Sequence, residues 1–183
     1  MASNTQHHDL PLPQFDRPVR LLIVVSPYYK AIADNLVAGA RAVAGQVGAS
    51  TDLVQVPGAL EIPTAIAMAS LHGIYDGYVA LGCVIRGETT HYDTVCNDSS
   101  RGLALLGLQG HAIGNGILTV ENAEQAAVRA DPGGQNKGGG AAAAALHLVA
   151  LSRKWSARRG SGTRAGDVDL IRLAGELEGQ SRT

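Results

Sequence analysis

The segment 86–91 brings together residue types that suit phosphate chemistry. It reads RGETTH and directly follows the apolar run 78–85. Gly87 allows the backbone to approach a ligand closely, and Glu88 and Thr89 lie at the start of the next expected helix. The free N–H groups and the positive dipole end of a helix N-terminus bind anions such as phosphate. A threonine N-cap with an acid in the first turn, which only stabilises the helix, is an equally open interpretation.

His91 ends this segment and is the residue best suited to proton transfer. A histidine changes its charge near neutral pH, so an imidazole beside an anion site can move protons. The alternative is a surface or capping histidine with no chemical role. The other five histidines lie in the N-terminal arm or lack a partner three or four residues away, so we expect no metal site. They are His7, His8, His72, His111 and His147.

Three further residues carry polar or aromatic groups at the ends of expected elements. Glu61 follows a Pro-Gly turn, where it is either a first-turn helix acid or a hydrogen-bond acceptor for a polar ligand. Tyr28 has a ring that can stack on a flat heterocycle, although an aromatic at a strand end is more often packing. Arg129 ends a short helix, where a cation also simply complements the helix dipole. Each residue therefore has a structural explanation as well as a chemical one.

These residues are positioned by alternating strand and helix patterns. Continuous β-branched runs predict strands buried on both faces, and apolar residues at steps of three and four predict amphipathic helices. The expected strands are 19–25, 51–56, 78–85 and 111–120. The expected helices are 29–47, 62–71, about 92–108, 122–130 and 138–155. Because strands alternate with helices, we predict an α/β fold in which a parallel sheet is covered on both faces.

Open parallel sheets bind ligands at the carboxyl ends of their strands, where loops meet helix N-termini. Tyr28, Glu61 and the 86–91 segment all follow expected strands in this way. Two glycine-rich stretches do not match nucleotide-binding loops. Residues 132–140 lack a Gly-Lys-Ser/Thr ending and join two helices, and residues 110–116 lie within a strand. The residues alone therefore favour a domain that binds a phosphorylated small molecule.

Composition limits the classes of function. The chain has 183 residues, of which 45% are hydrophobic, and this is enough for one domain. With 15 basic and 16 acidic residues the net charge is −1, which gives no electrostatic footprint for nucleic acid or an anionic membrane. Two cysteines without C-x-x-C spacing, no secretory leader and no membrane-length apolar run predict a soluble, cytoplasmic protein.

Two segments fall outside the strand and helix pattern. Residues 1–17 form a polar, proline-rich arm, and residues 156–183 form a Gly/Arg/Ser-rich tail that we expect to be flexible. Within the tail, residues 168–177 have the spacing of one weak helix. We therefore expect the α/β domain to span residues 18–155, and we assign no function to the tail.

Four stretches together resemble the 6,7-dimethyl-8-ribityllumazine synthases. They are VPGALEIP, ALGCVIRGETTHYD, GNGILTVENAEQAAVRA and NKGGGAAAAAL, in the family's order and at family-like distances, within about residues 17–155. The resemblance implies a transferase of riboflavin biosynthesis that uses no cofactor or metal. Its reaction is the condensation of 5-amino-6-ribitylaminouracil with 3,4-dihydroxy-2-butanone 4-phosphate. The implied fold is a flavodoxin-like three-layer α/β/α sandwich with a four-stranded parallel sheet of order 2-1-3-4.

The resemblance also assigns roles by matching positions. His91 matches the proton-transfer histidine, Arg129 the arginine that binds the butanone phosphate, and Tyr28 the aromatic that stacks on the pyrimidine. The segments that bind the ring and the ribityl chain match Ala59, Leu60, Glu61, Cys83, Val84 and Ile85.

Three more roles follow from the same resemblance. Glu88 and Thr89 match the loop that cradles the phosphate, and Lys137 would add positive charge near it. The family often places a phenylalanine at the position of Asn115, where the side chain lies near the substrate across a subunit interface. An asparagine there can instead hydrogen-bond the pyrimidine, so the resemblance leaves substrate affinity open.

The implied assembly is a homopentamer, or two stacked pentamers, with active sites between adjacent subunits. The turn 131–135 reads DPGGQ and differs from the turn usual in sixty-subunit capsids of this family, so we expect no capsid. An alternative function on the same fold is a carrier or sensor that binds riboflavin or lumazine with little turnover. His91, Arg129 and Lys137 argue against it, because a pure binder does not need a phosphate clamp beside a proton donor.

Overall fold

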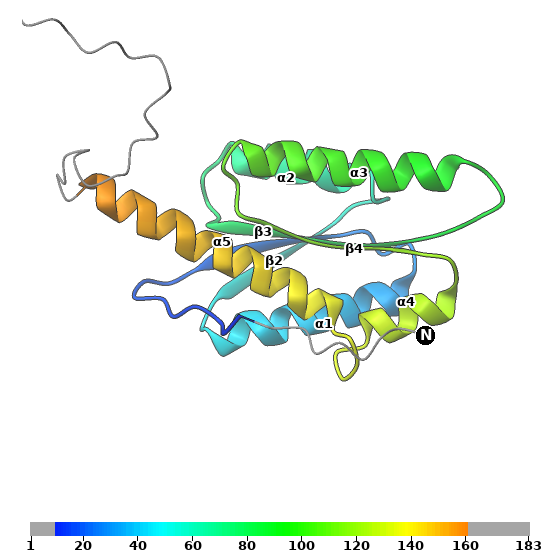
Figure 1. The fold of residues 1–183 in the computed structure, drawn as a ribbon, viewed down its shortest axis with the longest axis horizontal. Helices are drawn as coiled ribbons and strands as arrows, with labels where there is room; N and C mark the ends of the chain where they lie inside the picture. Colours follow the sequence, from blue (N-terminus) through cyan, green and yellow to red (C-terminus); the bar gives the residue numbers. More distant parts are fainter. Residues whose placement is uncertain (1–9, 161–183) are drawn as a thin grey trace, which may run out of the picture.

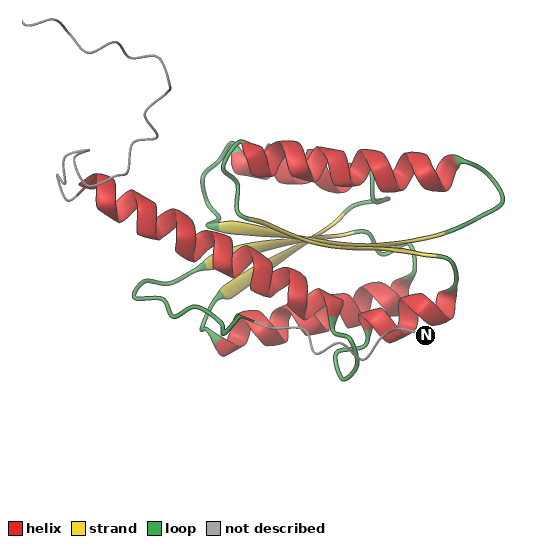
Figure 2. Ribbon diagram, viewed as in Figure 1, coloured by secondary structure: helices red, strands yellow, loops and turns green. Residues whose placement is uncertain are grey.

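The computed structural model describes residues 10–160 and confirms the predicted α/β/α sandwich (Figure 1). The elements run β1 (Arg20–Val25), α1 (Lys30–Gln46), β2 (Ser50–Gln55), α2 (Glu61–Ser70), β3 (Gly77–Ile85), α3 (His91–Leu108), β4 (Ile113–Val120), α4 (Ala123–Ala130) and α5 (Lys137–Gly160). The strands pair in parallel in the order β2-β1-β3-β4, as predicted. Helices α2 and α3 cover one face of the sheet, and α1, α4 and α5 cover the other, so the strands form a single middle layer (Figure 2).

The central strands β1 and β3 are buried on both faces, as their continuous apolar sequences predicted. Each residue from Leu21 to Val25 is at most 2% exposed. Alternate side chains enter two separate clusters: Ile23 packs with residues of α1 and α5, and Val24 packs with residues of α2 and α3. Burying one such side chain contributes about 1.5–3 kcal/mol. The two central strands therefore hold the loops at their carboxyl ends in fixed positions.

Helix α5 packs against its neighbours through direct backbone contact. Gly138 lies against the carbonyl group of Leu36 in α1, and Gly114 of β4 lies against the carbonyl group of Ala141 in α5. A Cβ atom at either glycine would collide with these groups. The glycine-rich stretch 132–140 therefore contributes to helix packing, which agrees with its lack of a nucleotide-loop signature.

The observed boundaries differ from the predicted ones mainly at the C-terminal end of α5. This helix continues to Gly160, beyond the expected domain end at residue 155, because the intervening alanine and arginine residues favour helix. The weak helix expected at 168–177 lies outside the described residues. Neither α5 nor any other helix within residues 10–160 is long and apolar enough to cross a membrane.

The described part of the N-terminal arm is attached to the domain. Leu12 and Phe15 pack against the core cluster on the α1 and α5 side of the sheet. Arg153 of α5 donates hydrogen bonds to the carbonyl oxygens of Arg17 at 2.9 Å and Pro18 at 2.7 Å. Its guanidinium group also lies 5.5 Å from the centroid of the Phe15 ring. Residues 12–18 are thus held against α5 rather than standing apart from it.

Candidate active site

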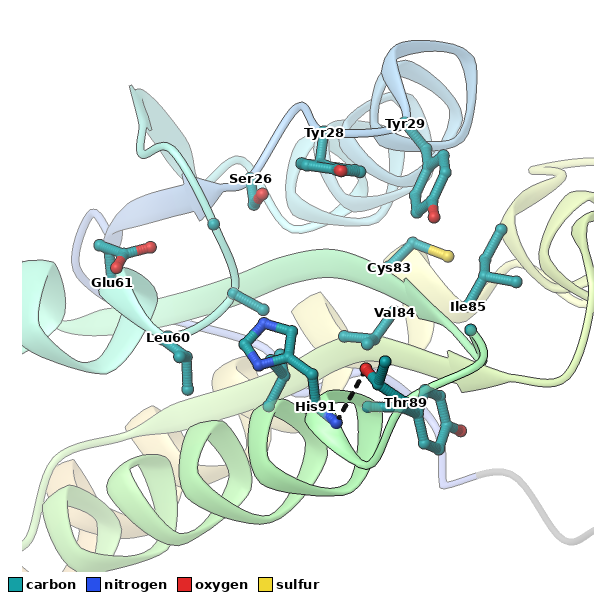
Figure 3. Close-up of a pocket in the computed structure, with 15 residues that line it drawn as sticks. Ser26, Tyr28, Tyr29, Leu60, Glu61, Cys83, Val84, Ile85, Thr89 and His91 are labelled. Atoms are coloured by element: carbon teal, nitrogen blue, oxygen red, sulfur yellow. Dashed lines mark hydrogen bonds between the residues drawn. The ribbon is translucent and has the colours of Figure 1, made fainter.

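A cavity of about 380 Å³ lies at the carboxyl ends of the central strands (Figure 3). It is formed by the loops after β1, β2 and β3 and by the first turns of α3. Neighbouring parallel strands end at the same edge of a sheet, which is why these loops converge. Nine of the predicted site residues line it: Tyr28, Ala59, Leu60, Glu61, Cys83, Val84, Ile85, Thr89 and His91.

The N-terminus of α3 forms one wall of the cavity. The helix begins at His91, and the side chain of its N-cap residue, Thr90, makes no capping hydrogen bond to any part of residues 10–160. Instead the Thr89 hydroxyl oxygen accepts a long hydrogen bond, 3.4 Å, from the backbone N–H of His91. Figure 3 shows the His91 ring projecting from α3 into the cavity. The weak cap and the position of this helix end both suit an anionic ligand.

Two aromatic rings follow β1 on the opposite wall. Tyr28 and Tyr29 meet edge to face, with their ring centroids 5.1 Å apart. Tyr28 is 76% exposed, so a flat heterocycle can reach its ring. Burial raises the pKa of the Tyr29 hydroxyl above its ordinary value, and Tyr28 and Cys83 raise this pKa further. Tyr29 is therefore a hydrogen-bond donor at neutral pH.

Cys83 and Glu61 give the cavity one neutral and one acidic group. Burial raises the pKa of the Cys83 thiol to about 11, so it stays protonated at neutral pH. Glu61 is the first residue of α2, as the structural interpretation predicted, and it also lines the cavity. Its Oε2 atom would lie 2.8 Å from a Cβ added at Gly58, so the carboxylate folds back over the turn before α2.

Four predicted site residues do not line this cavity. Glu88 is exposed in the loop before α3, and Lys137 is exposed at the start of α5. Arg129 lies near the end of α4, where its Nη1 donates a hydrogen bond to the carbonyl oxygen of Gln125 at 3.1 Å. This contact within the helix agrees with the alternative interpretation of Arg129, in which its positive charge complements the dipole at the end of the helix. Asn115 lies on β4 and lines a different groove.

Comparison with known proteins decides the family. Residues 18–153 match the family model described as 6,7-dimethyl-8-ribityllumazine synthase. This chain belongs to the 6,7-dimethyl-8-ribityllumazine synthase family. The predicted family is therefore confirmed, and with it the lumazine synthase activity of riboflavin biosynthesis that the resemblance implied.

Several relatives that carry the name 6,7-dimethyl-8-ribityllumazine synthase are more than half identical to this chain. The protein from Jannaschia sp. is 54% identical over 161 residues, which are 88% of this chain and 90% of the relative. The protein from Novosphingobium aromaticivorans is 55% identical over 137 residues, 75% of this chain and 99% of the relative. The protein from Methylorubrum populi is 55% identical over 140 residues, 73% of this chain and 83% of the relative.

The groove that contains Asn115 lies at the β4 edge of this lumazine synthase domain. Its volume is about 890 Å³, and residues of α3, β4 and α5 line it. Leu148, Leu151 and Trp155 are large apolar side chains that line the groove and remain exposed. The side-chain oxygen of Asn115 accepts a hydrogen bond of 3.0 Å from the backbone N–H of Ile117. Asn115 is therefore an exposed residue of the edge strand and does not line the cavity that holds His91.

Five residues that line the cavity were missed from the sequence: Ser26, Tyr29, Gly58, Tyr92 and Val95. Each is close in sequence to a predicted site residue. Tyr92 and Val95 follow His91 by one and four residues on α3, a spacing that places His91 and Val95 on one helix face. Helical spacing was the signal that could have found Val95. Within residues 10–160, no three His, Cys, Asp or Glu side chains are grouped as metal ligands.

Proposed function

We propose that the cavity binds 5-amino-6-ribitylaminouracil together with 3,4-dihydroxy-2-butanone 4-phosphate and condenses them to 6,7-dimethyl-8-ribityllumazine. One observation carries this proposal: an accessible aromatic ring, a helix N-terminus and a histidine face the same cavity. Tyr28 would stack on the pyrimidine, Glu61 would accept hydrogen bonds from it, and Thr89 with the α3 N-terminus would bind the phosphate. Arg129 and Lys137 would add positive charge near the phosphate, as the family resemblance implies.

The reaction needs only proton transfers and the close approach of two substrates. The 5-amino group attacks the butanone carbonyl and loses water to give an imine, and phosphate leaves by elimination. The ribitylamino nitrogen then closes the ring with loss of a second water. His91 would move protons in these steps, because its ring projects into the cavity. Most of the acceleration would come from holding the two substrates together, and His91 would contribute a smaller factor.

We also propose that a neighbouring copy completes the site. Asn115 lines a groove at the β4 edge instead of the cavity of its own chain. Exposed apolar side chains lie in two places: Leu148, Leu151 and Trp155 in the groove beside β4, and Met68 and Leu71 on α2 and at its C-terminal end. Two different exposed patches favour a head-to-tail contact, in which one patch meets the other on a neighbouring copy, and such contacts can close into a ring. These features support a homopentamer, alone or stacked in pairs, in which Asn115 reaches the substrate of its neighbour.

The two cysteines support a cytoplasmic location. Cys83 is buried, Cys96 is half-buried, and both are free thiols. Free thiols persist in reducing compartments. We therefore propose the cytoplasm as the site of this reaction.

The test mixes the purified protein with both substrates and follows the absorbance of the lumazine. The uncatalysed mixture and the variant His91→Ala are the controls. We expect product formation well above the uncatalysed rate, and His91→Ala should lower turnover but leave measurable activity, because binding alone still brings the substrates together. Product formation at the uncatalysed rate, with tight binding of riboflavin or the pyrimidine, would indicate the carrier function instead. Complete inactivity of a folded His91→Ala variant would contradict the smaller role for this residue.

A further inference from the structure

Arg86 directly follows β3, and its side chain contacts three groups on two other elements. Its Nε donates a hydrogen bond of 2.9 Å to the carboxylate of Glu121, just after β4. Its Nη1 donates a bond of 3.4 Å to the carboxylate of Asp93, in the first turn of α3. The guanidinium group also lies over the Tyr92 ring, 4.1 Å from its centroid. One side chain therefore joins the ends of β3 and β4 to the start of α3.

The loop between Arg86 and α3 has little support from packing. Residues 87–90 are all exposed, and a Cβ added at Gly87 would meet no atom within 4 Å. The position of this loop therefore depends on its two ends. At the first end, the backbone N–H of Arg86 donates to the carbonyl oxygen of Val120 at 2.9 Å. At the second end, the guanidinium contacts with Tyr92 and Asp93 hold the first turn of α3.

We propose that Arg86 is a positioning residue, which fixes the first turn of α3 and so places His91 and the anion-binding N–H groups. The planar guanidinium group suits this role, because it donates in several directions and stacks on a ring at the same time. A single exposed ion pair contributes little to stability, so the expected effect lies in the geometry of the site. This inference rests on the proposed function of the cavity.

Arg20 provides a matched control at the opposite end of the sheet. Its Nε and Nη2 donate to the Asp52 carboxylate at 3.1 and 2.6 Å, and its guanidinium lies 5.1 Å from the centroid of the Tyr75 ring. Arg20 is the first residue of β1, whereas the cavity lies at the carboxyl ends of the strands. The two arginines therefore make the same kinds of contact, but only Arg86 is next to the cavity.

The experiment compares the variants Arg86→Gln and Arg20→Gln in steady-state kinetics with each substrate varied in turn. We expect Arg86→Gln to lower kcat/KM for the butanone phosphate by about tenfold to a hundredfold, the size of effect that a small misplacement produces. Its KM for the pyrimidine should be unchanged, because Tyr28 and Glu61 stand on other loops. Arg86→Lys should recover part of the loss, and Arg20→Gln should match the original protein.

A second variant and a second ligand keep the inference falsifiable. Glu121→Gln removes the negative charge that Arg86 contacts and weakens that contact through an exposed side chain, and it should weaken use of the butanone phosphate in the same direction but less. Inorganic phosphate, followed by calorimetry, should bind Arg86→Gln more weakly than Arg20→Gln. The inference is overturned if Arg86→Gln uses the butanone phosphate as well as Arg20→Gln does. If Arg86→Gln does not fold, the same comparison is made between Glu121→Gln and Arg20→Gln. Failure of the original protein to form product would instead overturn the proposed function, and phosphate binding would still test Arg86.

Discussion

The pKa of the Cys83 thiol tests whether this wall of the cavity is shielded from water. The residue is 9% exposed, and burial raises the pKa of its thiol from 9.0 to about 11. At pH 8, a thiol with a pKa of 9.0 is about one-tenth thiolate, whereas Cys83 would be about one-thousandth thiolate. Only the thiolate reacts with iodoacetamide, so ionisation alone should slow alkylation of Cys83 by about a hundredfold at this pH.

The assay uses the variant Cys96→Ser, in which Cys83 is the remaining cysteine, and measures the alkylation rate between pH 7 and 11.5. We expect the rate to rise by about tenfold per pH unit beyond pH 9 and to level off near pH 11. Limited access slows the reaction equally at each pH and does not move the midpoint. A rate that levels off near pH 9 would refute the reasoning. The folded state also binds the thiol proton of Cys83 more tightly than the unfolded state does. The protonated thiol therefore contributes stability that is fully present below pH 9 and should be lost as the pH rises through about 11.

Two substitutions and one measurement of mass test the phosphate site, the packing of α5 and the assembly. Arg129→Ala should raise KM for the butanone phosphate more than it lowers kcat, and an unchanged KM would count against its role as a phosphate ligand. Gly114→Ala should lower the free energy of unfolding, measured in urea, by about 1–3 kcal/mol, because its Cβ would collide with the Ala141 carbonyl group. Gly107→Ala is the control, because a Cβ added there would meet no atom within 4 Å. Light scattering should give the mass of five or ten subunits, and a mass near sixty subunits would contradict the assembly inferred from the 131–135 turn.

The fold and the cavity could be predicted because both depend on patterns that are local in sequence. The continuous apolar run of β1 indicated burial on both faces, and this was confirmed. Tyr28, Glu61 and His91 were singled out because each follows a strand, and parallel strands bring such residues to one edge of the sheet. The structure places all three around the same cavity.

The features that escaped prediction depend on contacts between distant segments. Nothing near Arg86 in sequence indicates that it pairs with Glu121, because that contact exists only once β3 and β4 are neighbours. Nor does the alternation of β4 show that Asn115 faces a groove at the sheet edge. The stretch 132–140 resembles a flexible loop in composition, yet Gly138 packs against the backbone of α1. Close approach between two backbones leaves no hydrophobic pattern that a sequence could reveal.

The burial of β1 and β3 on both faces also determines which parts of the molecule can open without the rest. Amide hydrogens in these two strands should exchange with solvent only when the whole domain unfolds, whereas the outer strands β2 and β4 can separate in smaller fluctuations. The residues around the cavity are attached mainly to the ends of the slowly exchanging strands. Local opening at either edge of the sheet can then proceed while Tyr28 and Cys83, which lie at the ends of β1 and β3, keep their relative positions. Opening at the β2 edge would move Glu61, and opening at the β4 edge would release the contacts of Arg86 with Val120 and Glu121. The two edge strands are therefore the parts of the fold through which a fluctuation can disturb the site.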